Sequence, residues 1–212
     1  MIEAARDSTK KLNLQRVSFA VKDIETYSSE KISEKYEVVY SNAALHWVDD
    51  HTVIQRILEN LVAPGGFLAV QMPDTRRQPS HTLMKEAAVN CGFGDAVSDV
   101  RIPRMHHEYE WYYDLLQPCC QHIDMWSTEA VQQLPTAGSI HPVLQYTSST
   151  GLRPIVAAVR GASNDADAAE ALFLGEYTRL LTTHYTERRN CNGEDMITLF
   201  PFRRFFFVAR KK

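Results

Sequence analysis

Arg153 and His81 are candidates for binding a carboxylate. Arg153 stands in the pentapeptide from Thr150 to Pro154, and its guanidinium offers a planar fork of donors that pairs both carboxylate oxygens. His81 follows Pro79 and Ser80 at the start of an apolar helical pattern, where its ring can donate to the same kind of group. Each has a structural alternative: Arg153 as a solvated cation at a helix end, and His81 as a surface histidine beside a helix cap.

Two tyrosines could add hydroxyl groups to such a site. Tyr112 and Tyr113 lie in an aromatic-rich segment from His107 to Leu116, which predicts a helix bounded by Pro118. A tyrosine hydroxyl on this helix could point into a pocket. Aromatic side chains at this spacing also commonly pack in a core, and the sequence leaves both interpretations open.

The elements that must position these residues are organised around a predicted strand-helix-strand unit. Residues 36–40 predict an apolar strand that stops in a small polar turn at Ser41 and Asn42. Residues 53–62 then carry apolar side chains at helical spacing. This pattern predicts a helix that covers one face of the first strand.

Short signals mark both ends of that helix. Asp49 and Asp50 are placed to cap its start and to complement its dipole. Pro64 to Gly66 predicts its end, because proline cannot continue a helix and glycine adopts the left-handed turn easily. Residues 67–72 predict a second, nearly continuous apolar strand, as expected for a strand covered on both faces.

The connection between the two strands predicts where a ligand binds. A strand-helix-strand connection makes its strands parallel, and ligands of open parallel sheets bind at the carboxyl ends of the strands. Those ends are Ser41 with Asn42, and the residues from Gln71 to Asp74. We therefore expect a binding site at this edge of the sheet.

Apolar periodicity predicts the remaining elements. They are a strand over residues 17–21 that ends at Asp23 and Ile24, a helix capped by Ser80, a short strand over residues 123–126, helices over residues 139–149 and 168–185, and a last strand over residues 196–209 with a bulge at Pro201. Asp23 also has a structural alternative, as a loop aspartate that caps a turn.

Composition narrows the class of protein. The 212 residues are 44% apolar and 10% aromatic, which is enough for one sizeable core in one domain. A net charge of -3 gives no general field for nucleic acid or acidic membranes, so we expect a small-molecule partner. The sequence contains neither an apolar run of about 18 residues nor a signal-peptide core, and we expect a cytoplasmic protein.

The cysteines and histidines give no catalytic or metal signature. Cys91, Cys119, Cys120 and Cys191 lack metal-ligand spacing, and an adjacent pair is a poor candidate for an ordinary disulfide. We expect reduced thiols without a role. The sequence shows no metal-binding cluster and no Ser-His-Asp arrangement, so we expect no metal.

Four segments carry a more specific pattern. They are Ser41–Trp47, Pro64–Asp74, Pro79–Met84 and Thr150–Pro154. Together they resemble the trans-aconitate 2-methyltransferase family, within the class I S-adenosylmethionine-dependent methyltransferases. The resemblance covers nearly the entire chain, from Met1 to Arg210.

The resemblance implies a Rossmann-like α/β fold with a mixed, mostly parallel sheet and helices on both faces. In the family, a first strand and a glycine-rich loop hold the methionine part of the cofactor, whereas the first glycine here is Gly65. We therefore expect one methyltransferase domain over residues 1–212, shortened at the N-terminus, with a gap in the sheet beside residues 38–40. Its parts are a remaining cofactor side (1–75), substrate-side insertions (76–160), and a C-terminal helix and strand (161–212).

The resemblance also implies roles for individual residues. It places Asp23 and Ile24 beside the adenine of S-adenosylmethionine. It places four further residues near the methyl donor, namely Ser41, Asn42, Ala43 and Trp47. It implies that five residues bind the acid substrate, namely His81, Tyr112, Tyr113, Arg153 and, more loosely, Arg203.

The implied activity is transfer of a methyl group from S-adenosylmethionine to a carboxylate of trans-aconitate or a similar small polycarboxylic acid. A carboxylate is already ionised at neutral pH, so no catalytic acid or base is expected and the site mainly positions and neutralises. Two alternatives stay open. One is a catalytically inactive binding module that keeps the acid pocket without the cofactor cradle, and the other is an enzyme with a different small carboxylic acid as acceptor.

Overall fold

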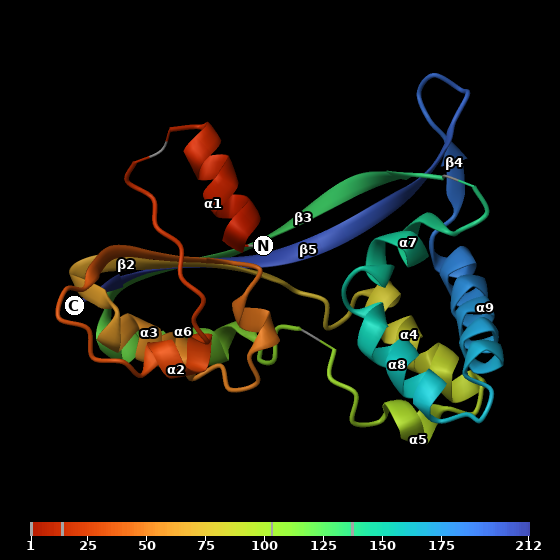
Figure 1. Ribbon diagram of the computed structural model, residues 1–212, viewed down its shortest axis with the longest axis horizontal. Helices are drawn as coiled ribbons and strands as arrows, with labels where there is room; N and C mark the ends of the chain where they lie inside the picture. Colours follow the sequence, from red (N-terminus) through yellow and green to blue (C-terminus); the bar gives the residue numbers. More distant parts are fainter. Residues whose placement is uncertain (1, 14, 103, 137) are drawn as a thin grey trace.

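A five-stranded mixed sheet forms the centre of the protein. The computed structural model describes residues 2–13, 15–102, 104–136 and 138–212. The strands lie in the order β1-β2-β5-β3, and β4 pairs with β5 (Figure 1). Their bounds are β1 (Tyr36–Asn42), β2 (Val62–Pro73), β3 (Cys120–Pro135), β4 (Glu187–Arg189) and β5 (Met196–Lys211).

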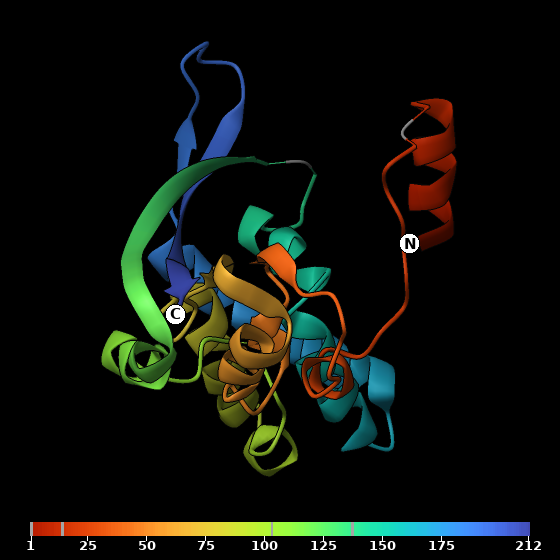
Figure 2. The ribbon, with the colours of Figure 1, turned by 90° about the vertical axis from the view of Figure 1, so that its left-hand side faces the viewer.

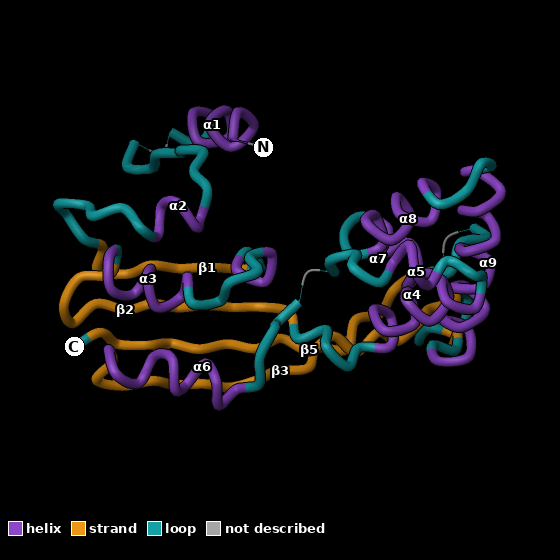
Figure 3. Tube along the Cα trace, turned by 90° about the horizontal axis from the view of Figure 1, so that it is seen from below, coloured by secondary structure: helices purple, strands orange, loops and turns teal. Residues whose placement is uncertain are grey.

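The helices fall into two groups in space. One group lies along the sheet, and the other gathers beside the N-terminal half of β5 (Figures 1 and 3). The first comprises α2 (Ile24–Ser28), α3 (Val53–Asn60) and α6 (Tyr109–Leu116); the second comprises α4 (Pro79–Asn90), α5 (Gly94–Val97), α7 (Pro142–Ser148), α8 (Leu152–Gly161) and α9 (Ala166–His184). Two single 3-10 turns are η1 (Leu45–Trp47) and η2 (Gln117–Cys119), and α1 (Ile2–Lys11) stands apart (Figure 2).

The predicted strand-helix-strand unit is confirmed. β1 runs parallel to β2, with Val38 opposite Phe67 and Asn42 opposite Gln71. The connecting helix α3 buries its apolar stripe at Val53, Ile54, Ile57 and Leu58. The carboxyl ends of β1 and β2 therefore meet at one edge of the sheet.

The boundaries of this unit differ from the predicted ones. α3 ends at Asn60 and β2 begins at Val62, so Pro64 to Gly66 lie inside the strand rather than ending the helix. Gly65 takes a φ of +74° there, a conformation that costs glycine little. At the helix start the N-cap is Thr52, whose backbone N–H donates to the Asp50 carboxylate over 2.9 Å.

The other strand pairings are antiparallel. β5 pairs antiparallel with β2, β3 and β4. The sheet is therefore mixed, as predicted, but the prediction that it is mostly parallel is wrong. The long β3–β5 ribbon runs from Cys120 opposite Lys211 to Pro135 opposite Ile197. Pro201 stays in register opposite Val131, so the bulge predicted there is absent from this ladder.

Two hydrophobic cores follow the two groups of helices. The first lies between the sheet and α3 and α6, where Leu68, Phe205 and Phe207 are buried. The second lies inside the helical group, around Phe173 and Tyr177 of α9. Aromatic and aliphatic burial of this extent is the main source of stability in each core.

The strand predicted over residues 17–21 does not form. These residues have no ladder in the part of the chain that the structure describes, and β1 is the edge strand of the sheet. An alternating pattern needs a neighbouring strand to satisfy its backbone groups, and periodicity alone does not supply one. Asp23 instead caps α2, because its carboxylate accepts the Thr26 backbone N–H over 2.9 Å.

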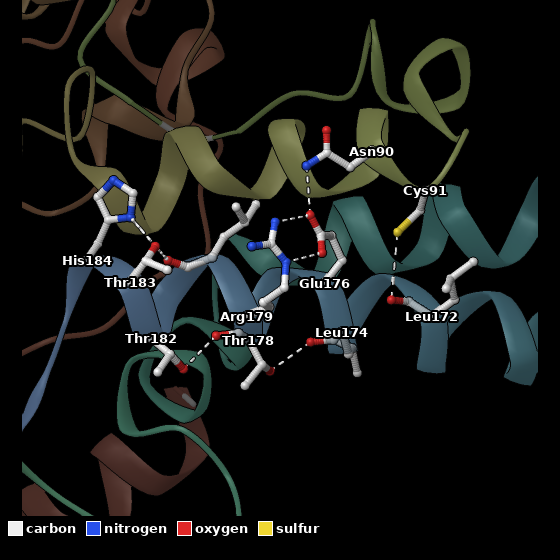
Figure 4. A network of polar contacts seen from close by, with 11 residues as sticks. Asn90, Cys91, Leu172, Leu174, Glu176, Thr178, Arg179, Thr182, Thr183 and His184 are labelled. Carbon is white, nitrogen blue, oxygen red and sulfur yellow. Dashed lines mark hydrogen bonds and ion pairs between the residues drawn. The ribbon is translucent and has the colours of Figure 1, made fainter.

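A polar cluster fastens α9 to α4. Asn90 at the end of α4 donates to the Glu176 carboxylate over 2.7 Å, and Arg179 donates to both oxygens of the same carboxylate (Figure 4). Cys91 donates its thiol to the Leu172 carbonyl over 3.7 Å. These contacts fix the helical group as one unit.

The lengths and composition of the helices also bear on membranes. Among the described residues, no helix combines the length and apolar character that crossing a bilayer requires.

Candidate active site

A cavity of about 580 Å³ opens at the predicted edge of the sheet, and we call it the edge cavity. Its size lies within the ordinary range for small-molecule sites. Its lining comes from five parts of the chain: β1, η1 and the turn between them (Asn42, Ala43, His46 and Trp47), β2 and the loop after it (Gln71, Pro73 and Thr75), α4 (His81), α7 and its following turn (Gln145, Tyr146, Ser149, Thr150 and Gly151), and β5 (Phe202 and Arg204). The carboxyl ends of the two parallel strands thus form one wall.

The turn after β1 has an unusual backbone. Ala43 has a φ of +50°, which is uncommon for a residue with a side chain, and its N–H donates to the Gln71 carbonyl over 3.0 Å. This bond ties the turn to β2 and leads the chain into η1. Asn42, Ala43 and Trp47 consequently all line the edge cavity.

Three buried polar side chains along this wall lack a hydrogen-bond partner within the described ranges. The atoms are Gln71 Nε2, His46 Nδ1 and Thr75 Oγ1, on residues that are only 4–6% exposed. A buried polar group without a partner costs about 1–3 kcal/mol, so native proteins keep few of them. Their concentration along one cavity indicates a site built for a polar ligand.

His81 is held at the cavity by tyrosines from the second helical core. Tyr185 Oη accepts the Ser80 backbone N–H over 3.1 Å, and Tyr177 donates to the Ser80 carbonyl over 2.6 Å. The imidazole lies against Gly151, where a Cβ would stand 3.4 Å from His81 Nε2. A Cβ at position 151 would thus make an ordinary van der Waals contact with the ring.

Burial controls the charge of His81. Desolvation, with a smaller contribution from His46, lowers the pKa of His81 to about 4. Desolvation likewise lowers the pKa of His46 to about 4. Both rings are neutral at pH 7, so they offer hydrogen bonds to a ligand but no positive charge.

The cation of the edge cavity is Arg204, which the sequence analysis did not select. Arg204 lies opposite Pro73 of β2, and its guanidinium stands 5.1 Å from the centre of the Phe202 ring. Across the described part of the chain it makes no ion pair. Strand alternation could have indicated Arg204, because the side chains of residues 202 and 204 lie on one face of the strand and that of residue 203 lies on the other.

Arg203 lies on the opposite side of β5. It lines a separate cavity of about 610 Å³ and stands 4.0 Å from the Glu129 carboxylate. Asp74 lines that same cavity, and its carboxylate is held by Arg76 over 2.8 and 2.9 Å. Burial alone would raise the pKa of Asp74, but the bonds from Arg76 produce a net lowering.

Three further residues expected to bind the acid also lie away from the edge cavity. Arg153 is exposed on α8, although its neighbours Thr150 and Gly151 line the cavity. Tyr112 is fully buried, with its hydroxyl hydrogen-bonded to His51 Nδ1. Tyr113 is 48% exposed on the other face of α6. The structural alternatives for these residues, core packing and solvated cation, match their positions.

The expected cofactor residues are divided in the same way. Asn42, Ala43 and Trp47 line the edge cavity, and Ser41 lies directly before them with a buried hydroxyl. Asp23 and Ile24 lie at the start of α2 and do not line it. Within the described ranges, the lining of the edge cavity thus includes three of the expected cofactor residues and no carboxylate that could bind the ribose of S-adenosylmethionine.

The electrostatics of the edge cavity favour an anion. Its lining includes one arginine and two neutral histidines, and no aspartate or glutamate contributes to it from residues 2–13, 15–102, 104–136 or 138–212. An anionic ligand entering this cavity meets no opposing carboxylate. The arrangement can bind an acid and orient it through several donors.

Comparison with known proteins agrees with this architecture. A family model described as a methyltransferase domain matches residues 1–136. The trans-aconitate 2-methyltransferase of Methylobacterium radiotolerans is 35% identical over 216 residues, covering all of this chain and 74% of that protein. The enzymes of the same name from Paracidovorax citrulli and Variovorax paradoxus are 34% and 33% identical, with the same coverage of each chain. This chain belongs to the trans-aconitate 2-methyltransferase family.

Solved structures support the same fold. The YcgJ protein from Bacillus subtilis has a TM-score of 0.51 at 11% identity, over all of this chain and 79% of that one. The family and this likeness confirm the expected Rossmann-like methyltransferase fold. Membership of the family also identifies the chain as an S-adenosylmethionine-dependent methyltransferase.

Proposed function

We propose that this protein transfers a methyl group from S-adenosylmethionine to a carboxylate of trans-aconitate or a similar small polycarboxylic acid, forming a methyl ester. One observation carries the proposal: a cavity lined by Arg204 lies at the carboxyl ends of two parallel strands, and among the described residues no carboxylate lines it or pairs with that arginine. We infer trans-aconitate as the acid because the relatives are named trans-aconitate 2-methyltransferases.

Arg204 would neutralise the bound acid. Its guanidinium offers paired donors to a carboxylate and forms no ion pair with another residue in the described part of the chain. Pairing with the guanidinium compensates part of the negative charge of the acid and so favours its binding in the edge cavity. Phe202 beside Arg204 supports the guanidinium from one side.

The neutral donors would fix the orientation of the acid. His81, Gln71 and Thr75 can each donate a hydrogen bond without adding charge, and the last two carry buried atoms that need a partner. Binding an oxygen-rich acid would satisfy those atoms. Much of the expected rate enhancement then comes from holding the reacting carboxylate in line with the methyl group.

The methyl donor would lie beside Asn42, Ala43 and Trp47. When bound, S-adenosylmethionine supplies an electrophilic methyl group on a sulfonium centre. An ionised carboxylate attacks such a group directly, so the protein needs no residue to remove a proton. The exposed Trp47 ring can pack against the donor and keep water from the reacting atoms.

A direct assay tests the proposal. The purified chain is incubated with S-adenosylmethionine labelled in its methyl group and with trans-aconitate, and the ester is separated and counted. We expect label in a base-labile methyl ester that depends on both the acid and the protein. Ester formation no greater than in the blank would remove the proposed function.

A further inference from the structure

A second cavity, which we call the basic recess, adjoins the edge cavity. Its volume is about 430 Å³, and it is bounded by α4 and by residues 98–102 and 104–106. Thr75 and His81 line both cavities, so these two side chains form the wall between them. A ligand that passes them can occupy both spaces.

Positive charge dominates the basic recess. Of the described residues that line it, four are cations, namely Arg76, Lys85, Arg101 and Arg104, and one, Asp99, is a carboxylate. Two of these cations are already paired: Arg76 with Asp74 and Glu108, and Arg101 with Asp49. The charge balance therefore depends on the other two.

Lys85 and Arg104 are available to a ligand. Lys85 Nζ donates to the Ser98 carbonyl over 3.0 Å, which leaves two of its donors. Neither residue forms an ion pair with any other residue that the structure describes. The backbone N–H of Arg104 donates to the His46 carbonyl over 3.2 Å, which ties this segment to the edge cavity.

Buried polar atoms point to the same conclusion. Thr75 is 4% exposed and its hydroxyl has no partner in the described ranges, nor does the buried His106 Nε2. Both residues line the basic recess. A solvated basic surface would leave no such atoms, whereas a bound group with several oxygens would satisfy them.

We propose that the basic recess is a second carboxylate subsite, which holds one carboxylate of the acid whose reacting carboxylate lies in the edge cavity. The inference rests on the proposed function and adds a specificity to it. Acids with two or more carboxylates would bind across Thr75 and His81, with Lys85 and Arg104 on the distal group. Acids with one carboxylate would lose that contact.

The test compares a tricarboxylate with a monocarboxylate. KM is measured for trans-aconitate and for crotonate with the full chain, with Lys85→Ala and with Arg104→Ala. We expect each variant to raise KM for trans-aconitate about tenfold, the size of one charge-assisted hydrogen bond, and to change KM for crotonate less than twofold. Lys85→Arg should restore most of the loss, and Arg188→Ala on exposed β4 is the control for removing one distant charge.

Several outcomes would overturn the inference. An unchanged KM for trans-aconitate would do so, as would equal increases for both acids. If the wild-type chain forms no ester, the proposed function fails and calorimetry with trans-aconitate alone decides the subsite. Binding that weakens about tenfold in Lys85→Ala and Arg104→Ala supports it; binding that is absent, or unchanged by the variants, rejects it. Melting curves confirm that each variant is folded.

Discussion

Replacing Arg204 tests the assignment of the edge cavity, because a neighbouring arginine provides a matched control. Arg204 lines the edge cavity without an ion pair in the described part of the chain, whereas Arg203 lines a different cavity near Glu129. Arg204→Ala removes the charge-assisted hydrogen bonds to the acid, which are worth about 1.5–3 kcal/mol. This corresponds to a loss of about 10- to 150-fold in kcat/KM for trans-aconitate.

The assay is the initial rate of ester formation over a range of trans-aconitate concentrations. We expect Arg203→Ala to stay within about twofold of wild type, since its partner Glu129 and its own side chain are half exposed. Arg204→Lys should be intermediate, because lysine keeps the charge but not the planar fork. The reasoning is refuted if Arg203→Ala loses as much as Arg204→Ala, or if Arg204→Ala matches wild type.

Three further predictions concern the same framework. Burial lowers the pKa values of His46, His51 and His81 to about 4. Between pH 6.5 and 4 the unfolded chain therefore binds more protons than the folded chain, so each histidine lowers the free energy of unfolding by about 1.4 kcal/mol per pH unit as pH falls. Urea titrations at pH 7, 6 and 5 measure this, and a free energy of unfolding that does not change with pH would contradict it. Phe205→Ala should cost about 3–5 kcal/mol by urea denaturation, since Phe205 is 1% exposed, and more than Phe206→Ala, whose half-buried ring stacks on Trp126. Tyr112→Phe should lower the free energy of unfolding by about 1–3 kcal/mol, because it leaves His51 Nδ1 unpaired, and should leave KM for trans-aconitate unchanged. A raised KM would indicate that Tyr112 contributes to acid binding.

The strand-helix-strand unit could be predicted because its signals are local. The apolar run before Ser41, the helical spacing after Thr52 and the run before Pro73 each specify one element, and the crossover fixes their parallel pairing. Residues 17–21 carry a similar alternation but form no strand, because strand formation depends on a neighbour that sequence periodicity does not identify. The antiparallel course of β5 between β2 and β3 is likewise a tertiary property.

The site could be predicted only where the backbone fixes the direction of a side chain. Asn42, Ala43 and Trp47 follow directly from the end of β1, and His81 from the start of α4. Arg203 was expected only from a loose resemblance, and Arg204 was not selected; one position along a strand reverses the face, and the sequence did not set the register. Tyr112 is buried and Arg153 is exposed, and neither lines the edge cavity, because periodicity does not distinguish a core face or solvent from a ligand-bearing face.

The central claim is that the edge cavity binds the acid through Arg204. The most direct measurement is a crystal structure of the full chain grown with trans-aconitate. The account predicts the acid in the edge cavity, with a carboxylate within hydrogen-bond distance of the Arg204 guanidinium. Trans-aconitate bound instead in the cavity lined by Arg203, with the edge cavity filled only by water, would contradict it.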